Sequence, residues 1–269
     1  MAEVLWTGIA LGESPRWHDR RLWFSDWVAG ELRAGDDVVM RLSSFPFSFD
    51  WLPDGRLLVV SGREAVLLAG GEPYAELGAI AAPPWNELVV DGRGNAYVNY
   101  AGFEFPGGEF APGGVAIVRP DGSGERVADG LAFPNGMAVT ADGSTLIVAE
   151  SYAGRLTAFA IGEDGSLSER RVWAAVDGSA PDGICIDASG AVWYADVPNR
   201  RCVRVREGGE VLDVVELDRG GFACMLGGED GRTLFIMAAE WGGIGNVGAG
   251  EPTGQVLAVQ APEPGAGWP

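Results

Sequence analysis

The stretch ADGSTLIVAES at residues 141–151 shows the pattern that decides the fold. Its first half contains residues that tolerate tight turns, and its second half is an apolar run typical of a β-strand. The same combination recurs along the chain as HDRRLWFSD from His18, PDGRLLVVS from Pro53, DGRGNAYVNY from Asp91, DASGAVWYAD from Asp187 and EDGRTLFIMA from Glu229. Successive copies start about 35 to 50 residues apart, which is the length of one four-stranded β-propeller blade.

The six copies predict an all-β fold, a six-bladed β-propeller with four-stranded antiparallel blades. The 42 glycines and 16 prolines favour many tight turns over long helices. A β-sandwich would lack such a long period and a solenoid would have a shorter one, so the repeat favours the propeller. We expect a single domain over residues 1–269, with an irregular C-terminal tail at residues 260–269.

The charge and the cysteines limit the classes of partner and of compartment. Nineteen Lys and Arg residues face 38 Asp and Glu residues, so the formal net charge is -19. Such a surface repels phosphate backbones and anionic lipid, and we expect neither a nucleic-acid nor a membrane partner. The three cysteines lack a CxxC spacing, and the chain starts without the features of a signal peptide. These features predict a soluble cytoplasmic protein.

One register position of the repeat carries four polar residues. Counting back eight residues from the turn in each copy gives Glu13, Phe47, Asn86, Asn135, Asp182 and Ala223. Equivalent positions in a propeller form a ring about the axis, here at the start of each innermost strand. Buried polar groups need partners, and two carboxylates across a narrow channel repel each other. A divalent cation bound by the four polar residues would resolve both problems.

Two carboxylates and two amide oxygens form a hard, oxygen-only set of ligands. This chemistry favours Ca²⁺, with Mg²⁺ or Mn²⁺ as alternatives, and places Zn²⁺ second because no histidine or thiolate joins the set. Each residue also has a simpler interpretation. PNG at residues 134–136 and PDG at residues 181–183 are ordinary turn sequences, Asn86 could be a capping amide, and Glu13 could be a solvated charge.

The same segments resemble the gluconolactonase/regucalcin (senescence marker protein) family of sugar-lactone lactonases. The matching pieces are GESPRW at 12–17, WNE at 85–87, FPNGMAVTADGSTLIVAES at 133–151 and PDGICIDASGAVWYAD at 181–196. The resemblance implies a six-bladed propeller with one divalent metal held by Glu13, Asn135 and Asp182. It also implies that Asn86 contacts substrate or a water on the metal, and that Asp182 is the catalytic carboxylate.

One departure from the family pattern bears on the substrate. Lactonases of this family that act on sugar acids commonly carry Arg-x-Asn-Asp where this chain has Pro84-Trp85-Asn86-Glu87. The missing arginine removes a cationic contact for substrate hydroxyls and suggests a more apolar ligand. Aromatic residues near strand ends are further candidates for the pocket wall: Trp27, Phe47, Trp85, Tyr152 and Trp241.

The segment YAGFEFPGGEFAPGG at residues 100–114 is too rich in Gly and Pro to be a strand. We interpret it as a loop beside the channel mouth and as a candidate lid, with a disordered surface loop as the alternative. In the lid interpretation Glu104 and Glu109 reach inward to the substrate, and the apolar walls are Phe103, Phe105 and Phe110.

These features predict a metal-dependent hydrolase that opens a lactone. The cation would polarise the carbonyl, and Asp182 would accept a proton from the attacking water. A carboxylate bound to a cation is a weak base, so a water activated by the cation alone is the alternative. Ester or phosphotriester hydrolysis at the same site, or a non-catalytic Ca²⁺-binding propeller, are the competing functions.

Overall fold

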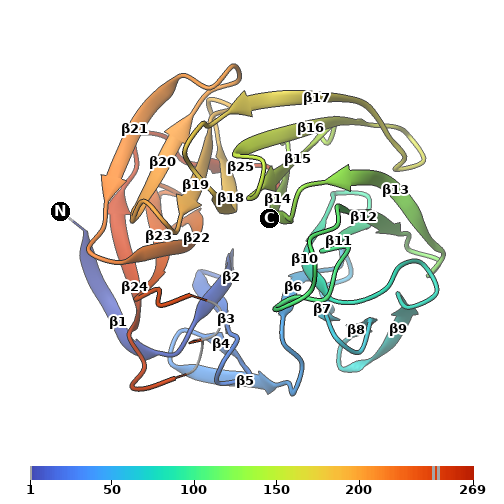
Figure 1. Cartoon of the computed structure of the whole chain (residues 1–269), viewed down its shortest axis with the longest axis horizontal. Coiled ribbons are helices and arrows are strands. Elements are labelled where there is room, and N and C mark those ends of the chain that lie inside the picture. Colours follow the sequence, from blue (N-terminus) through green and yellow to red (C-terminus); the bar gives the residue numbers. More distant parts are fainter. Residues whose placement is uncertain (1, 244–245, 247–248) are drawn as a thin grey trace.

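The computed structural model, which describes residues 2–243, 246 and 249–269, is a ring of six antiparallel sheets (Figure 1). The sheets follow one another around a central axis in the order of the sequence. Five of them have their first strand toward the axis, and in the sixth the strand toward the axis is β22. None of these residues lies in an α-helix, and none forms a helix able to span a membrane. The prediction of a six-bladed propeller with four-stranded blades is confirmed.

Five blades are formed by consecutive strands, running from the axis outward. The first three contain β2 (Gly12–His18), β3 (Arg21–Asp26), β4 (Glu31–Ala34) and β5 (Asp37–Arg41); β6 (Phe47–Trp51), β7 (Leu57–Ser61), β8 (Val66–Ala69) and β9 (Glu72–Glu76); and β10 (Trp85–Val90), β11 (Ala96–Tyr100), β12 (Gly113–Val118) and β13 (Gly124–Leu131). The next two contain β14 (Pro134–Val139), β15 (Thr145–Glu150), β16 (Arg155–Ile161) and β17 (Leu167–Ala175); and β18 (Pro181–Asp187), β19 (Val192–Asp196), β20 (Arg201–Val205) and β21 (Val211–Glu216).

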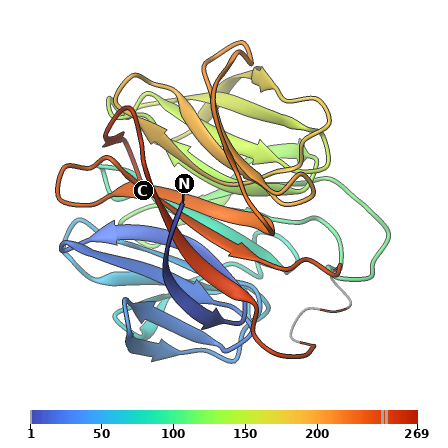
Figure 2. The same ribbon diagram turned by 90° about the vertical axis from the view of Figure 1, so that its left-hand side faces the viewer.

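The sixth blade joins the two ends of the fold. Its inner strands are β22 (Gly220–Gly227), β23 (Thr233–Ala239) and β24 (Gly254–Gln260), and its outer strand is β1 (Glu3–Ile9). Antiparallel pairing of Glu3 with Ala258 and of Ile9 with Gly254 closes the ring, and Figure 2 shows these two strands side by side.

The repeat found in the sequence is the hairpin between the first and second strands of each blade. The turn of the copy at residues 141–151 joins β14 to β15, whose apolar run is buried almost throughout. Outermost strands such as β5 and β21 are largely exposed, since they form the rim of the ring. The apolar core therefore lies between blades. Leu58 and Leu67 of the second blade, for example, pack in one cluster with Leu88 and Val98 of the third.

Residues 260–269, expected to be an irregular tail, are anchored to the ring at two points. Residues 265–266 form β25 (Gly265–Ala266), which pairs with β18 as a fifth strand of that sheet. Trp268 then forms a bridge with Val139 of β14 and packs against the core there. Gln260 is the last residue of β24, and residues 261–264 have no regular structure.

Candidate functional site

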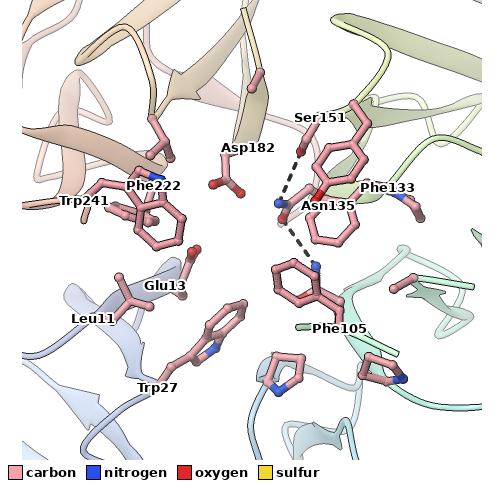
Figure 3. Close-up of a pocket in the computed structure, with 18 of the residues that line it drawn as sticks. Leu11, Glu13, Trp27, Phe105, Phe133, Asn135, Ser151, Asp182, Phe222 and Trp241 are labelled. Atoms are coloured by element: carbon pink, nitrogen blue, oxygen red, sulfur yellow. Dashed lines mark hydrogen bonds between the residues drawn. The ribbon is translucent and has the colours of Figure 1, made fainter. Parts of the chain in front are cut away.

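The four polar residues predicted to form a ring line one pocket. Its volume is about 380 Å³, and Glu13, Asn86, Asn135 and Asp182 contribute to it from the starts of β2, β10, β14 and β18. Figure 3 shows the side chains of Glu13, Asn135 and Asp182 directed toward a common centre. Glu13, Asn86 and Asn135 are each less than a tenth exposed, whereas Asp182 keeps part of its surface open to the pocket.

Irregular pairing at the start of the inner strands positions these side chains. The register of β10 shifts between Trp85 and Leu88, and the register of β18 shifts between Pro181 and Ile184. Strands β2 and β14 carry shifts at the corresponding places, just after Glu13 and around Asn135. A bulge bends its strand and redirects a side chain. The inner strand β22 also shifts, between Gly221 and Ala223, whereas β6, which supplies Phe47, pairs without a shift.

The glycine after Asn135 and the glycine after Asp182 allow the inner strands to approach closely. A Cβ on Gly136 would lie 2.5 Å from the carbonyl oxygen of Asp182, and one on Gly183 would lie 2.5 Å from the Cβ of Ala223. Both glycines lie within strands, so the interpretation of PNG and PDG as turns is wrong. Glycine is required there because no side chain fits between neighbouring blades.

A chain of hydrogen bonds connects the amides of the site. Asn86 Nδ2 donates to Asn135 Oδ1 at 3.4 Å, and Asn135 Nδ2 donates to the Ser151 hydroxyl at 3.4 Å. Ser151 Oγ donates in turn to the carbonyl oxygen of Pro181 at 2.8 Å. These bonds use one N–H of each asparagine amide, and Asn86 Oδ1 receives no hydrogen bond from the described residues.

Two oxygens in this centre have no hydrogen-bond partner among the described residues. They are Asn86 Oδ1 and Asp182 Oδ1, and both are fully buried. A buried acceptor without a partner is costly, and a charged one more so.

The two carboxyl groups of the site are strongly perturbed. Withdrawal from water raises the pKa of Glu13 well above its usual range, and the negative charges of Asp182 and Glu87 raise it further. Burial likewise raises the pKa of Asp182, with added repulsion from Glu87 and Asp196. Both groups therefore lack a positive partner that would stabilise their charge.

This set of donors fits a hard divalent cation. Carboxylate and amide groups line one pocket, two of their oxygens have no hydrogen-bond partner among the described residues, and the carboxyl groups lack a counter-charge there. Within the described part of the chain no group of three or more His, Cys, Asp or Glu side chains is placed to hold a metal ion. A site here would therefore depend on the amides Asn86 and Asn135 as well as on the two carboxylates.

Sequence reasoning missed a buried polar network beside the pocket. Glu87 accepts hydrogen bonds from the Ser14 hydroxyl and, at 3.4 Å, from the Arg16 guanidinium, and its backbone N–H donates to Asn99 Oδ1 at 3.1 Å. Arg16 also donates to the carbonyl oxygen of Leu88 at 2.8 Å. Ser14 and Arg16 lie in GESPRW and Glu87 lies in WNE, so the motifs that pointed to the site also contained its supporting residues.

Two predicted substrate contacts lie outside the pocket. Trp85 and Phe47 are fully buried and belong to apolar clusters between blades. Trp85 precedes Asn86 in β10, and successive side chains of a strand point to opposite faces. Trp27, which was also predicted as a wall residue, does line the pocket. Its indole N–H donates a hydrogen bond to the carbonyl oxygen of Phe47 at 2.5 Å.

The loop between β11 and β12 lies at the pocket, but its glutamates do not line it. Glu104 forms an exposed ion pair with Arg63 at 3.1 Å, and Arg63 also donates to the carbonyl oxygen of Phe105 at 3.1 Å. Glu109 is exposed. The loop instead contributes Phe105, whose ring lies 4.7 Å from the ring of Phe133, another residue of the wall.

The predictions for the remaining aromatic residues are mixed. Tyr152 and Trp241, named as wall residues from the sequence, both line the pocket. Phe103 and Phe110 do not line it; they pack around Tyr152 behind the wall, with ring centroids 6.4 and 5.6 Å from that of Tyr152.

The sequence of this chain is similar to those of known proteins. The family model described as "SMP-30/Gluconolactonase/LRE-like region" matches residues 11–240. The chain is 26% identical to Pentonolactonase XacC of Haloferax volcanii over 265 residues, covering 93% of this chain and 89% of that protein. It is 27% identical to 6-deoxy-6-sulfogluconolactonase of Pseudomonas putida, covering 85% of this chain and 83% of that protein.

A solved structure supports the fold. The calcium-binding protein regucalcin from Agrobacterium tumefaciens superposes with a TM-score of 0.80 at 20% identity, covering 99% of this chain and 95% of that one. At this identity the likeness concerns the propeller alone.

Proposed function

The chain belongs to the SMP-30/gluconolactonase/LRE-like family, and we propose that it is a divalent-cation-dependent hydrolase that opens a lactone ring. Two relatives with matches over most of the chain are named as lactonases, which supports the class of reaction. We propose Ca²⁺ as the first choice of cation because all candidate ligands are hard oxygens, and Mg²⁺, Mn²⁺ and Zn²⁺ as alternatives for the assay.

The observation that carries this proposal is the convergence of oxygen donors from separate blades on one pocket. Glu13, Asn135 and Asp182 would hold the cation, and Asn86, whose Oδ1 has no partner, would contact the substrate or a water. A closed structural ion site would leave no room for a ligand. Here the donors lie in a pocket of about 380 Å³, a volume typical of a small-molecule site.

The chemistry follows from these positions. A divalent cation held by Glu13, Asn135 and Asp182 would supply a Lewis acid for the lactone carbonyl. Asp182, directed into the pocket, would accept a proton from the attacking water. The water oxygen adds to the acyl carbon, the ring C–O bond breaks, and the proton passes to the leaving oxygen, so the product is a hydroxy acid. The apolar wall would limit the water around the reacting carbonyl and so strengthen electrostatic contacts there.

Chelation followed by re-addition of single cations tests the proposal. Purified protein would be assayed on a panel of lactones, acyclic esters and phosphotriesters. We expect chelation to abolish lactone hydrolysis and one cation to restore it, and we expect Asp182→Asn to remain inactive. Glu229→Gln is the matched control, since Glu229 is an exposed carboxylate paired only with Arg20.

The outcomes separate the competing functions. Turnover of phosphotriesters or acyclic esters without turnover of any lactone would replace the proposed reaction by another hydrolysis at the same site. A cation that raises the melting temperature while no substrate of the panel is turned over would support a non-catalytic binding protein. Activity that survives complete chelation would refute the dependence on a cation.

A further inference from the structure

The walls of the pocket differ in character from its floor. Five of its 20 lining residues have an acidic, amide or aliphatic hydroxyl side chain: Glu13, Asn86, Asn135, Ser151 and Asp182. Tyr152 is counted with the aromatic wall. The other 15 are aliphatic, aromatic or proline residues. A ligand would therefore meet polar atoms at one end and apolar surface along the rest of its length.

No lysine, arginine or histidine is among the residues that line this pocket in the described structure. Two arginines near the pocket form hydrogen bonds with other groups. Arg16 bonds to Glu87 and to the carbonyl oxygen of Leu88, and Arg63 bonds to Glu104 and to the carbonyl oxygen of Phe105. A cation held by Glu13 and Asp182 would balance only those two carboxylates. A carboxylate, sulfonate or phosphate on the substrate would thus enter an apolar pocket without a partner, which is unfavourable.

The floor also offers few partners for hydroxyl groups. The Ser151 hydroxyl donates to Pro181, and the Asn135 amide donates to Ser151. Among the described residues, Asn86 Oδ1 and Asp182 Oδ1 have no hydrogen-bond partner. Figure 3 shows Asp182 directed toward the centre where the cation and the reacting carbonyl would lie. The several hydroxyls of a sugar ring would lose water here without equivalent hydrogen bonds.

Aromatic side chains form two facing walls that lead from this floor to the mouth. On one side Phe105 and Phe133 lie with ring centroids 4.7 Å apart, and Phe133 stacks on Tyr152 at 4.6 Å. On the other side Phe222 packs against Trp241 at 5.5 Å, with Trp27 nearby (Figure 3). Tyr152 and Trp241 are 57% and 42% exposed. Apolar surface on both walls is therefore available for a ligand to cover.

From this arrangement we infer that the substrate is an uncharged lactone with an apolar alkyl or aryl substituent, and not a polyhydroxylated or anionic sugar lactone. The part of this inference that concerns hydrolysis rests on the proposed function, whereas the part that concerns binding rests on the pocket walls. The lactone carbonyl lies at the oxygen-lined floor and the substituent runs between the two aromatic walls toward the mouth.

The primary test is a series of γ-lactones assayed with the protein loaded with its cation. Lengthening the substituent from γ-valerolactone to γ-octalactone adds three methylenes. We expect kcat/KM to rise about fourfold per methylene where the added group is fully buried. D-Glucono-1,5-lactone and a lactone carrying a carboxylate are expected to react at least about tenfold more slowly than γ-octalactone. A flat or falling series, or a preference for the sugar lactone, would overturn the inference.

Variants of the wall residues test where the apolar substituent of the substrate binds. Phe105→Ala and Tyr152→Ala each remove one aromatic ring from the wall, and Tyr152 is exposed enough that its loss should not disturb folding. Each is expected to reduce the gain between γ-valerolactone and γ-octalactone by about threefold to tenfold. Val172→Ala is the control, because Val172 is an exposed apolar residue on β17 that does not line the pocket. An equal loss in all three variants would contradict the assignment of the wall.

A binding measurement separates this inference from the proposed reaction. Calorimetric titration with 5-alkyl-2-pyrrolidinones, cyclic amides that resist hydrolysis, reports on the walls even if no lactone is turned over. Affinity that rises with the length of the alkyl group would support the apolar ligand class although the proposed hydrolysis had failed. Absence of binding together with absence of turnover would overturn both.

Discussion

Replacing Gly183 by alanine should destabilise the ring at the site itself. Gly183 follows Asp182 in β18, and its Cα hydrogen faces β22 of the next blade. An added Cβ would lie 2.5 Å from the Cβ and 2.6 Å from the Cα of Ala223, and 3.2 Å from the carbonyl oxygen of Phe222. Two of these neighbours are backbone atoms, so a rotamer change cannot relieve the overlap, and the two inner strands must separate.

The magnitude follows from the cost of overpacking. Inserting a methyl group into a well-packed core costs about 1–3 kcal/mol. For a domain of this size each kcal/mol lowers the melting temperature by about 2–4 °C, so Gly183→Ala should melt about 2–12 °C below the parent protein. The double variant Gly183→Ala/Ala223→Gly removes the contact at 2.5 Å but leaves the one at 2.6 Å, and it should recover only part of this loss.

The assay is thermal unfolding with and without added Ca²⁺. Gly78→Ala is the matched control, since its new Cβ would have only the Ala65 Cβ nearby, at 3.8 Å, and its backbone is not left-handed. That variant should be neutral or about 0.4–1 kcal/mol more stable. Displacement of β18 should also move Asp182 and weaken cation binding. A Gly183→Ala protein with the parent melting temperature and cation affinity would refute the close packing of β18 on β22.

Three further outcomes are expected. Asp182→Asn should raise the melting temperature of the cation-free protein, because the substitution removes a buried carboxylate that has no partner among the described residues. Added cation should no longer raise the melting temperature of this variant; an unchanged response to cation would exclude Asp182 as a ligand. Arg63→Ala should change the free energy of unfolding by less than about 1 kcal/mol, since its ion pair with Glu104 is exposed. It should raise KM, because Arg63 also bonds to Phe105 and its loss frees that segment of the wall; equal KM values would contradict this role. The three cysteines are buried, and burial raises the pKa of the Cys185 and Cys224 thiols, so a thiol reagent should label none in the native protein and all three in guanidinium.

The part of the site that was predictable from the sequence is the part set by the repeat. Glu13, Asn86, Asn135 and Asp182 occupy equivalent places in four blades, so the turn that follows each of them fixes its position relative to the axis. The same reasoning places Ala223 and Phe47 on the innermost strands, where the structure has them.

What could not be predicted depends on the orientation of a side chain or on contacts between distant segments. Trp85 is one residue from Asn86, yet that single step turns its side chain into the core between blades. Glu104 was expected to point inward, but Arg63, 41 residues earlier, holds it at the surface. Phe133 has a φ of 57°, a left-handed backbone conformation that no local sequence pattern predicts for phenylalanine.

The pairing of β1 with β24 has a consequence for the order in which the protein can be completed. Residues 3–9 are synthesised long before residues 254–260, yet they form adjacent strands of one blade. Until the later strand is made, the earlier one has no partner, and the first blade has no sixth blade to pack against. Glu13 lies in β2, the strand that follows β1 and packs against β22 of the sixth blade, so the candidate cation site acquires its final shape only when the ring closes. Function in this protein therefore waits for the sixth blade to form.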